Sequence, residues 1–220
     1  MRPLGVGKIF NRDPRNNTKQ CQGAPSRFIF RVISWIAVAA LNRLYCLFQQ
    51  PARLTFFLMP ILIRTVVITS SDACSVGERE DTSGETLVHL LVELGAEIVA
   101  KEIVNDDLDP LADMMRSYAD RNDVNLIVTT GGTGFGPRDN TPEATRRVIE
   151  REAPGLAEAM RGQTLKNTPM AMISRGVCGI RSGTLIVNLP GSPKGVRESF
   201  EIIKPVLSHA IALLEGTASH

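Results

Sequence analysis

The stretch that decides the fold is residues 125–145, NLIVTTGGTGFGPRDNTPEAT, in which an apolar run leads through a glycine-rich loop into a helix start. Residues 125–130 predict a strand that is apolar on both faces, which is typical of a central strand in a parallel sheet. Thr141-Pro142-Glu143 predicts the start of a helix with Thr141 as its N-cap. A strand, a glycine loop and a helix in this order indicate an α/β fold.

Strand and helix patterns alternate on both sides of this stretch. Further strands are predicted over 64–70, 96–104, 170–174 and 184–189, with a turn or hairpin over 176–183. Helices are predicted to begin at Asp81, at Asp109-Pro110 and at Thr141, and to cover 154–165 and 196–214, the last bent at Pro205. This alternation predicts a three-layer α/β/α sandwich with a mostly parallel sheet.

Composition narrows the function classes. Hydrophobic residues make up 43% of the 220 residues, enough for a core, and charged residues make up 22%, which argues against global disorder. Residues 1–58 hold nine of the 25 basic residues and one of the 23 acidic residues. The remaining 16 basic and 22 acidic residues give the rest of the chain a net charge of −6, so no nucleic-acid partner is expected.

The cysteines form no CxxC pair and the three histidines do not cluster. The cysteines are Cys21, Cys46, Cys74 and Cys178. We therefore expect free thiols in a reducing compartment and a cytoplasmic location, with no zinc site.

Residues 1–58 differ from the rest and define the one domain boundary that the sequence predicts. The apolar part of this segment is interrupted by arginines, and its longest charge-free run, Val32–Asn42, has 11 residues. A spanning helix needs about 20, so no membrane association is expected. Three interpretations remain open: an upstream extension of a chain that starts at Met59, an organelle transit peptide, or a membrane or docking segment. We expect residues 1–58 to be dispensable and residues 59–220 to form the domain.

The glycine-rich loop after residues 125–130 predicts a phosphate site. Its glycines let backbone amides turn toward an anion near a helix start. It is neither a Walker A loop nor a GxGxxG fingerprint, and the alternative is a tight strand-to-helix turn. Asp139 beside bound phosphate implies Mg²⁺ between them, although Asp139 could instead cap the helix. Arg138 is either a phosphate clamp or a solvated side chain.

Polar loops follow three other predicted strands. They are Ser70-Ser71-Asp72, Asn105-Asp106-Asp107 and Leu189-Pro-Gly-Ser-Pro-Lys194. Ligands of open α/β sheets bind at the carboxyl ends of strands, so these loops are expected at one edge with the glycine loop. Each of them has turn or cap chemistry as its alternative interpretation.

Three motifs in this order, SSD with DTSG, TTGGTG with PRDNTPEAT, and LIVNLPGSPKG, resemble the molybdenum cofactor biosynthesis family. This family includes molybdopterin adenylyltransferase and cofactor biosynthesis protein B, and the resemblance covers residues 64–216, about 70% of the chain. It implies a three-layer fold and Mg²⁺- and ATP-dependent adenylylation of molybdopterin with release of pyrophosphate. The family's two key aspartates, which would also hold Mg²⁺, match Asp139 and, less distinctly, Asp106, with Asp107 adjacent.

The resemblance also implies a homotrimer or hexamer and a pathway partner, the molybdate-inserting enzyme. The substrate- and phosphate-binding residues expected from the loops are Ser71, Asp72, Gly131, Gly132, Thr133, Gly134, Arg138, Thr141, Pro190, Gly191, Ser192 and Lys194. One alternative is a molybdopterin-binding protein of the protein B type without robust adenylyltransferase activity. A second is an amidase class that carries an added domain, which a body of about 160 residues cannot hold.

Overall fold

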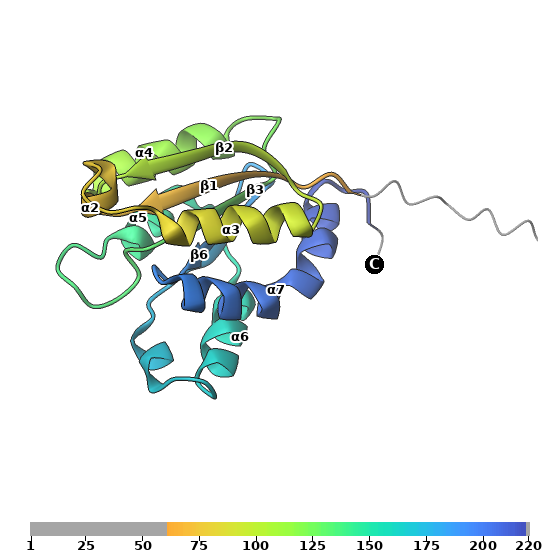
Figure 1. Cartoon of the computed structure of the whole chain (residues 1–220). Helices are drawn as coiled ribbons and strands as arrows, with labels where there is room; N and C mark the ends of the chain where they lie inside the picture. Colours follow the sequence, from red (N-terminus) through yellow and green to blue (C-terminus); the bar gives the residue numbers. More distant parts are fainter. Residues whose placement is uncertain (1–60, 219–220) are drawn as a thin grey trace, which may run out of the picture. The chain divides into compact units, whose positions relative to one another are not determined.

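Six strands form one sheet with helices on both of its faces (Figure 1). The computed structural model describes residues 61–218, so the interpretation of residues 1–58 lies outside the described residues. The elements in chain order are β1 (Arg64–Ser70), α2 (Asp72–Ser75), α3 (Thr82–Glu93), β2 (Glu97–Val104), α4 (Leu108–Ala119), β3 (Leu126–Thr130), α5 (Thr141–Val148), β4 (Arg151–Glu152), α6 (Pro154–Thr164), the 3₁₀ helix η1 (Pro169–Ile173), β5 (Cys178–Arg181), β6 (Thr184–Leu189) and α7 (Pro193–Leu214).

The strand order is β2-β1-β3-β6-β5-β4. Neighbours among β2, β1, β3 and β6 pair in parallel, whereas β5 pairs antiparallel with both β6 and β4. The segment 176–183, predicted as a turn or hairpin, contains the strand β5 itself, which pairs antiparallel with β6; Ser182 and Gly183 form the turn between them with positive φ. The predicted mostly parallel sheet is confirmed. None of the helices in the described part of the chain is long and apolar enough to cross a membrane.

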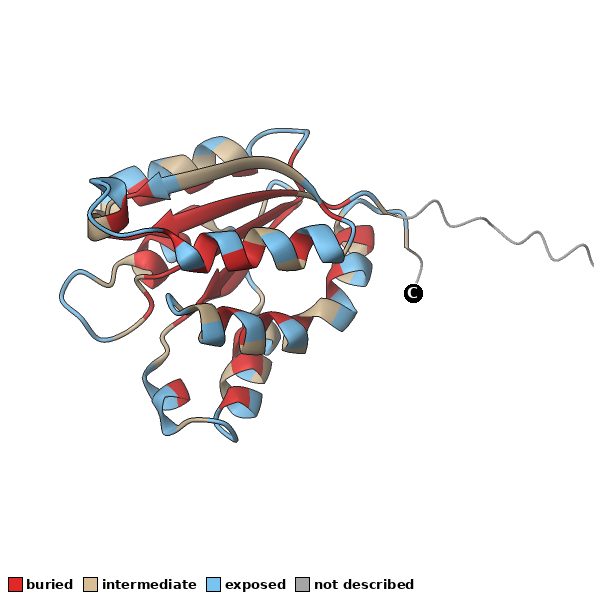
Figure 2. Cartoon of the chain, viewed as in Figure 1, coloured by how far each residue is buried: buried red, intermediate tan, exposed pale blue. Residues whose placement is uncertain are grey.

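Two apolar layers enclose the sheet because neighbouring residues of a strand face opposite sides. Val67 and Val128 pack with α3, α6 and α7, while Val66 and Ile127 pack with α4 and α5. The strands β1, β3 and β6 are buried along almost their whole length, and each helix presents one buried and one exposed side (Figure 2). Phe200 of α7 is fully buried. Moving this side chain from water into the core stabilises the fold by about 2–3 kcal/mol.

Residues 170–174, predicted as a strand, form the 3₁₀ helix η1 instead. Pro169 occupies its first turn, and the Thr168 hydroxyl accepts a hydrogen bond from the Met170 amide at 3.3 Å. Met170 and Met172 are exposed, and Ala171 between them is buried, so only the smallest side chain of these three packs inward. The prediction was wrong here because a short apolar run does not by itself distinguish a buried strand from a surface turn.

Three helix starts differ from the sequence-based boundaries. The N-cap of α4 is Asp107, two residues before Asp109, and the N-cap of α5 is Asn140. Thr141 is the first residue of α5, and its hydroxyl donates to the Gly131 carbonyl at 2.9 Å instead of capping. The helix α7 begins at Pro193 and contains Pro205. Figure 1 shows that this helix changes direction along its length.

The polar loops gather at the carboxyl edge of the parallel strands. The chain leaves β1 toward α3 on one face and leaves β3 toward α5 on the opposite face. The edge between β1 and β3 is therefore the topological switch point, where open α/β sheets bind ligands.

Candidate functional site

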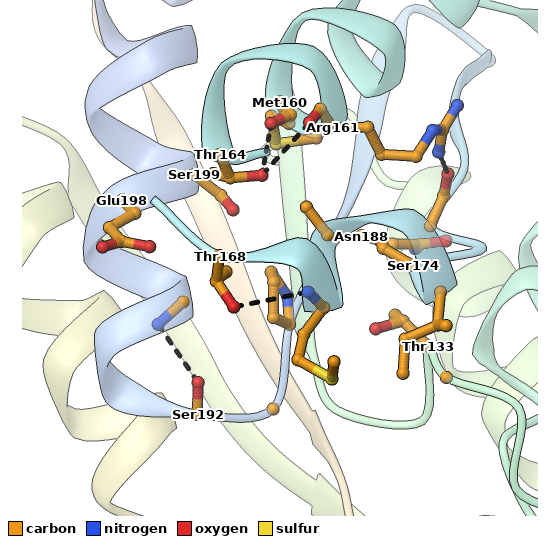
Figure 3. Close-up of a pocket in the computed structure, with 18 of the residues that line it drawn as sticks. Thr133, Met160, Arg161, Thr164, Thr168, Ser174, Asn188, Ser192, Glu198 and Ser199 are labelled. Atoms are coloured by element: carbon orange, nitrogen blue, oxygen red, sulfur yellow. Dashed lines mark hydrogen bonds between the residues drawn. The ribbon is translucent and has the colours of Figure 1, made fainter. Parts of the chain in front are cut away.

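A cavity of about 390 Å³ opens next to this edge. Its walls come from the glycine loop after β3, from α6, from residues 168–176, from the loop after β6 and from the first turns of α7 (Figure 3). The polar side chains that Figure 3 places around it include Thr133, Ser174 and Ser192. Four of the sequence-predicted loop residues after β3 and three after β6 line this cavity: Gly132, Thr133, Gly134, Asp139, Pro190, Gly191 and Ser192.

Steric crowding explains the glycines of the loop. Gly131 has a φ of +98°, and a Cβ there would lie 2.2 Å from the carbonyl oxygen of Ser70. Gly132 has a φ of +60°, and its Cβ would lie 2.4 Å from Oγ1 of Thr141. Only glycine allows the backbone of β3 to turn this tightly against β1 and α5.

The turn leaves consecutive backbone donors unpaired. Within residues 61–218, the N–H groups of Gly132, Thr133 and Gly134 have no hydrogen-bond acceptor. All three residues line the cavity, and Thr133 is buried. Successive free amides at a turn form a concave anion site, so this loop can bind phosphate oxygens.

Asp139 brings a carboxylate to the same cavity. Its Oδ2 accepts a hydrogen bond from the Gly136 amide at 2.6 Å, and its backbone amide donates to the Gly136 carbonyl at 3.0 Å. This side chain closes its own loop and does not cap α5, whose N-cap is Asn140. Asp139 therefore lies beside the free amides of the glycine loop, with its carboxylate charge at the cavity wall.

Arg175, which the sequence did not predict as a site residue, holds the glycine loop through hydrogen bonds. Its Nε donates to the Gly134 carbonyl at 2.6 Å, Nη2 donates to the Asp139 carbonyl, and its amide donates to the Thr133 carbonyl at 2.8 Å. Its Nη1 binds Glu143 in the first turn of α5. One guanidinium thus holds both ends of the loop and the helix that follows it.

Replacing Arg175 with lysine is expected to loosen this loop without unfolding the domain. A lysine keeps the charge but cannot bind two carbonyls and a carboxylate with one planar group. Amide hydrogen exchange of residues 134–139 should become at least about tenfold faster, because each hydrogen bond lost contributes roughly 1 kcal/mol or more. Exchange in β1 and β3 should stay unchanged, and an equal acceleration there would show that Arg175 supports the whole fold instead.

A separate acidic cluster, which we define as Asp72, Asp106 and Asp107, lies at the ends of β1 and β2. Oδ1 of Asp106 accepts a hydrogen bond from the Ser70 hydroxyl at 2.6 Å, and Oδ2 accepts one from the Asp72 amide at 2.9 Å. The amide of Asp106 donates back to Asp72 at 3.0 Å. These reciprocal bonds fix the direction of the Asp106 carboxylate.

Arg138 reaches from the glycine loop into the acidic cluster. Its Nε and Nη2 bind the two carboxylate oxygens of Asp72 at 3.0 and 2.8 Å, and Nη1 binds Asp107 at 2.6 Å. The Arg138 guanidinium, followed by the Asp106 amide, holds the pKa of Asp72 below its usual value. The hydrogen bonds that Arg138 donates to Asp72 and then to Asp107 raise the pKa of Arg138. Arg138 is therefore half exposed yet paired with two carboxylates, and it does not line the cavity.

The other predicted site residues have structural contacts of their own. The Ser71 hydroxyl caps α2 by accepting the Cys74 amide at 3.2 Å, and it also accepts Arg79 Nη2 at 2.8 Å. Ser192 caps α7 through the Gly195 amide at 3.1 Å. Lys194 has a side chain that is 75% exposed and lies 3.9 Å from Glu198. Lys194 does not line the cavity.

The cavity carries more negative than positive charge. Its charged lining residues are Asp139, Glu198 and Arg161. Arg161 and the polar lining residues Thr164, Asn188 and Ser199 were missed, because they come from ordinary helix and strand patterns with no motif. Asn188 is buried and bonds Thr129 and Thr145 at 3.0 and 2.9 Å, which ties β6 to β3 and α5.

Comparison with known proteins identifies relatives over the described domain. The family described as "Probable molybdopterin binding domain" matches residues 66–209. A molybdenum cofactor synthesis protein of Drosophila melanogaster, cinnamon, is 46% identical over 154 residues, covering 70% of this chain and 26% of that protein. The chain thus spans about a quarter of the length of this relative.

Two further relatives match over most of their own length. A molybdopterin adenylyltransferase of Helicobacter pylori (strain J99) is 41% identical over 152 residues, which is 68% of this chain and 86% of that protein. The crystal structure of the molybdopterin biosynthesis enzyme MoaB from Thermus thermophilus has 50% sequence identity and a TM-score of 0.67. That comparison covers 70% of this chain and 98% of the other.

Proposed function

The chain belongs to the molybdopterin-binding domain family of molybdenum cofactor biosynthesis, and on this premise we propose that it is a nucleotidyltransferase that adenylylates molybdopterin with ATP. The observation that carries the proposal is the glycine loop, where free amides at residues 132–134 and the Asp139 carboxylate line one cavity. A phosphate site with an adjacent carboxylate suits phosphoryl chemistry, because that chemistry needs positioning and charge neutralisation more than covalent help from the protein.

The proposed reaction joins two phosphates. An oxygen of the terminal phosphate of molybdopterin forms a bond to the α-phosphorus of ATP, and the bond from this phosphorus to the α–β bridging oxygen breaks. The electron pair leaves with the bridging oxygen, so pyrophosphate is released. The amides of Gly132–Gly134 would bind the oxygens on which negative charge collects, and Arg175 would keep those amides in place.

The donor set of the site fits Mg²⁺. Mg²⁺ prefers oxygen ligands and is held by one or two carboxylates together with phosphate oxygens. Asp139 offers a carboxylate at the cavity, where phosphate oxygens could not otherwise bind beside a negative charge. Asp106 offers a second carboxylate, although it does not line the cavity. When bound, the ion would neutralise charge on the phosphates; the protein's part is to hold Asp139 through the Gly136 amide.

The direct test measures pyrophosphate release from ATP when molybdopterin is added to the full chain. The proposal expects release that requires molybdopterin, ATP and Mg²⁺ together. Tight binding of molybdopterin without pyrophosphate release would instead support the alternative, a molybdopterin-binding protein of the protein B type.

Alanine at Asp106 is expected to reduce adenylylation at least about tenfold, whereas alanine at Asp107 should reduce it less. The Asp106 carboxylate accepts hydrogen bonds from the Ser70 hydroxyl and the Asp72 amide, which fix its direction. Asp107 has a side chain that is 47% exposed, and it pairs with Arg138. The measurement is the turnover of both variants at saturating Mg²⁺, and a larger loss at Asp107 would reverse the assignment.

We further propose that the chain works in the cytoplasm as a homotrimer or hexamer that passes its product to the molybdate-inserting enzyme. The relatives named as cofactor synthesis proteins support the pathway. Light scattering of the full chain measures the oligomer mass directly.

A further inference from the structure

A second cavity, of about 310 Å³, adjoins the one at the glycine loop. The two cavities share Ala157, Arg161, Ser174 and Gly176 as lining residues, so they lie side by side. The second cavity differs in its charge: three arginines, Arg146, Arg161 and Arg175, line it together with one acid, Glu152.

Two of these arginines have hydrogen-bond donors to spare. Arg161 is half-buried and donates one bond, from Nη1 to the Gly176 carbonyl at 2.8 Å. No carboxylate within residues 61–218 lies within 4.0 Å of its guanidinium. Arg146 lies 3.9 Å from both Glu143 and Glu152, which is too long for a hydrogen bond. Arg175, by contrast, is committed to the glycine loop.

The charge balance favours an anion here. If Glu143 and Glu152 are both counted against the three arginines, one positive charge remains. Cys178 also lines this cavity, and burial raises the pKa of its thiol to about 12, so the thiol stays neutral and adds no negative charge. The cavity at the glycine loop holds two carboxylates and Arg161, which gives the opposite sign.

We propose that the second cavity binds a phosphate-bearing anion through Arg146 and Arg161, and that this anion is the pyrophosphate portion of the nucleotide. Guanidinium groups bind phosphate oxygens through pairs of N–H donors. The Ser174 hydroxyl, at the boundary of both cavities, supplies another donor. The identity of the ligand rests on the proposed function, whereas the binding of an oxyanion does not.

The test is calorimetric titration of the full chain with inorganic pyrophosphate, without nucleotide, molybdopterin or Mg²⁺. Replacing Arg146 with glutamine should weaken binding about tenfold, the scale of one lost charge-assisted hydrogen bond. Glutamine at Glu152 should tighten binding, because it removes the acid that faces Arg146. The matched control is Arg147→Gln, next in the same helix, since Arg147 pairs with Asp109 at 2.7 Å and does not line the cavity. It should leave binding within about twofold.

Equal weakening by the Arg146 and Arg147 variants would overturn the proposal, because it would indicate a response to net charge alone. Absence of pyrophosphate binding to the unaltered chain at millimolar concentrations would also overturn it. The two proposals can fail separately. If pyrophosphate binding depends on Arg146 but ATP and molybdopterin yield no pyrophosphate, the anion site is supported and the proposed adenylyltransferase activity is rejected. If adenylylation proceeds and Arg146→Gln changes neither pyrophosphate binding nor the KM for ATP, the anion site is rejected and the adenylyltransferase activity is supported.

Discussion

Replacing Asp139 with asparagine is expected to lower the rate of adenylylation by about 10²-fold or more, with the fold intact. Asparagine has the same shape, and its oxygen can still accept the Gly136 amide at the position where Asp139 accepts it at 2.6 Å. The substitution therefore removes the charge and keeps the loop. A single electrostatic group in a preorganised site contributes a factor of this size.

The measurement is kcat at saturating ATP and Mg²⁺, together with amide exchange of the loop. Asp113→Asn is the matched control, because Asp113 is an exposed acid of α4 that pairs only with Arg116 at 2.6 Å within the described residues. It should keep near-normal kcat. Near-normal turnover of the Asp139 variant would remove Asp139 from the reaction, whereas a loss accompanied by fast loop exchange would assign it a structural role.

Alanine at Gly131 is expected to have the largest effect on stability. The added Cβ would lie 2.2 Å from the Ser70 carbonyl oxygen in a backbone with φ of +98°. Positive φ alone costs about 1–3 kcal/mol in a residue with a side chain, and the collision with backbone adds to it. A loss of about 3 kcal/mol or more should lower the thermal midpoint by roughly 6–12 °C in a domain of this size.

Gly183 provides the matched control. It also has positive φ, +85°, but a Cβ there would meet nothing within 4 Å. Gly183→Ala should therefore show only the conformational cost, about 1 kcal/mol. If both variants shift the midpoint equally, the contact between Gly131 and Ser70 does not limit the substitution.

The strands and the glycine loop could be predicted from sequence because local chemistry determines them. The apolar runs at β1, β3 and β6 are buried as the patterns indicated, and Asp81 caps α3 by accepting the Gly84 amide at 2.8 Å. Gly95, with φ of +88°, follows the end of α3 as predicted. Each of these signals depends on residues within one turn or one strand of each other.

The contacts that complete the site are long-range, and no local pattern reports them. Arg175 and Gly134 are 41 residues apart in sequence, and Arg138 and Asp72 are 66 apart. An arginine that fastens a loop and an arginine in solvent look alike in a single sequence. Arg161 illustrates the same limit, since its place in α6 follows from helix periodicity while its position between two cavities follows from the packing of distant segments.

Arg138, in the loop after β3, joins the loops after β1 and β2 through its exposed ion pairs with Asp72 and Asp107. Because these ion pairs are exposed, the connection is sensitive to dissolved salt. Arg138, Asp72 and Asp107 have side chains that are about half exposed, so mobile ions can approach them. The bond from the Ser70 hydroxyl to Asp106 has no cationic partner to screen and should persist at high ionic strength. The loops are therefore connected in two ways. The Arg138 ion pairs weaken as the ionic strength rises, whereas the hydrogen bond between Ser70 and Asp106 does not depend on it.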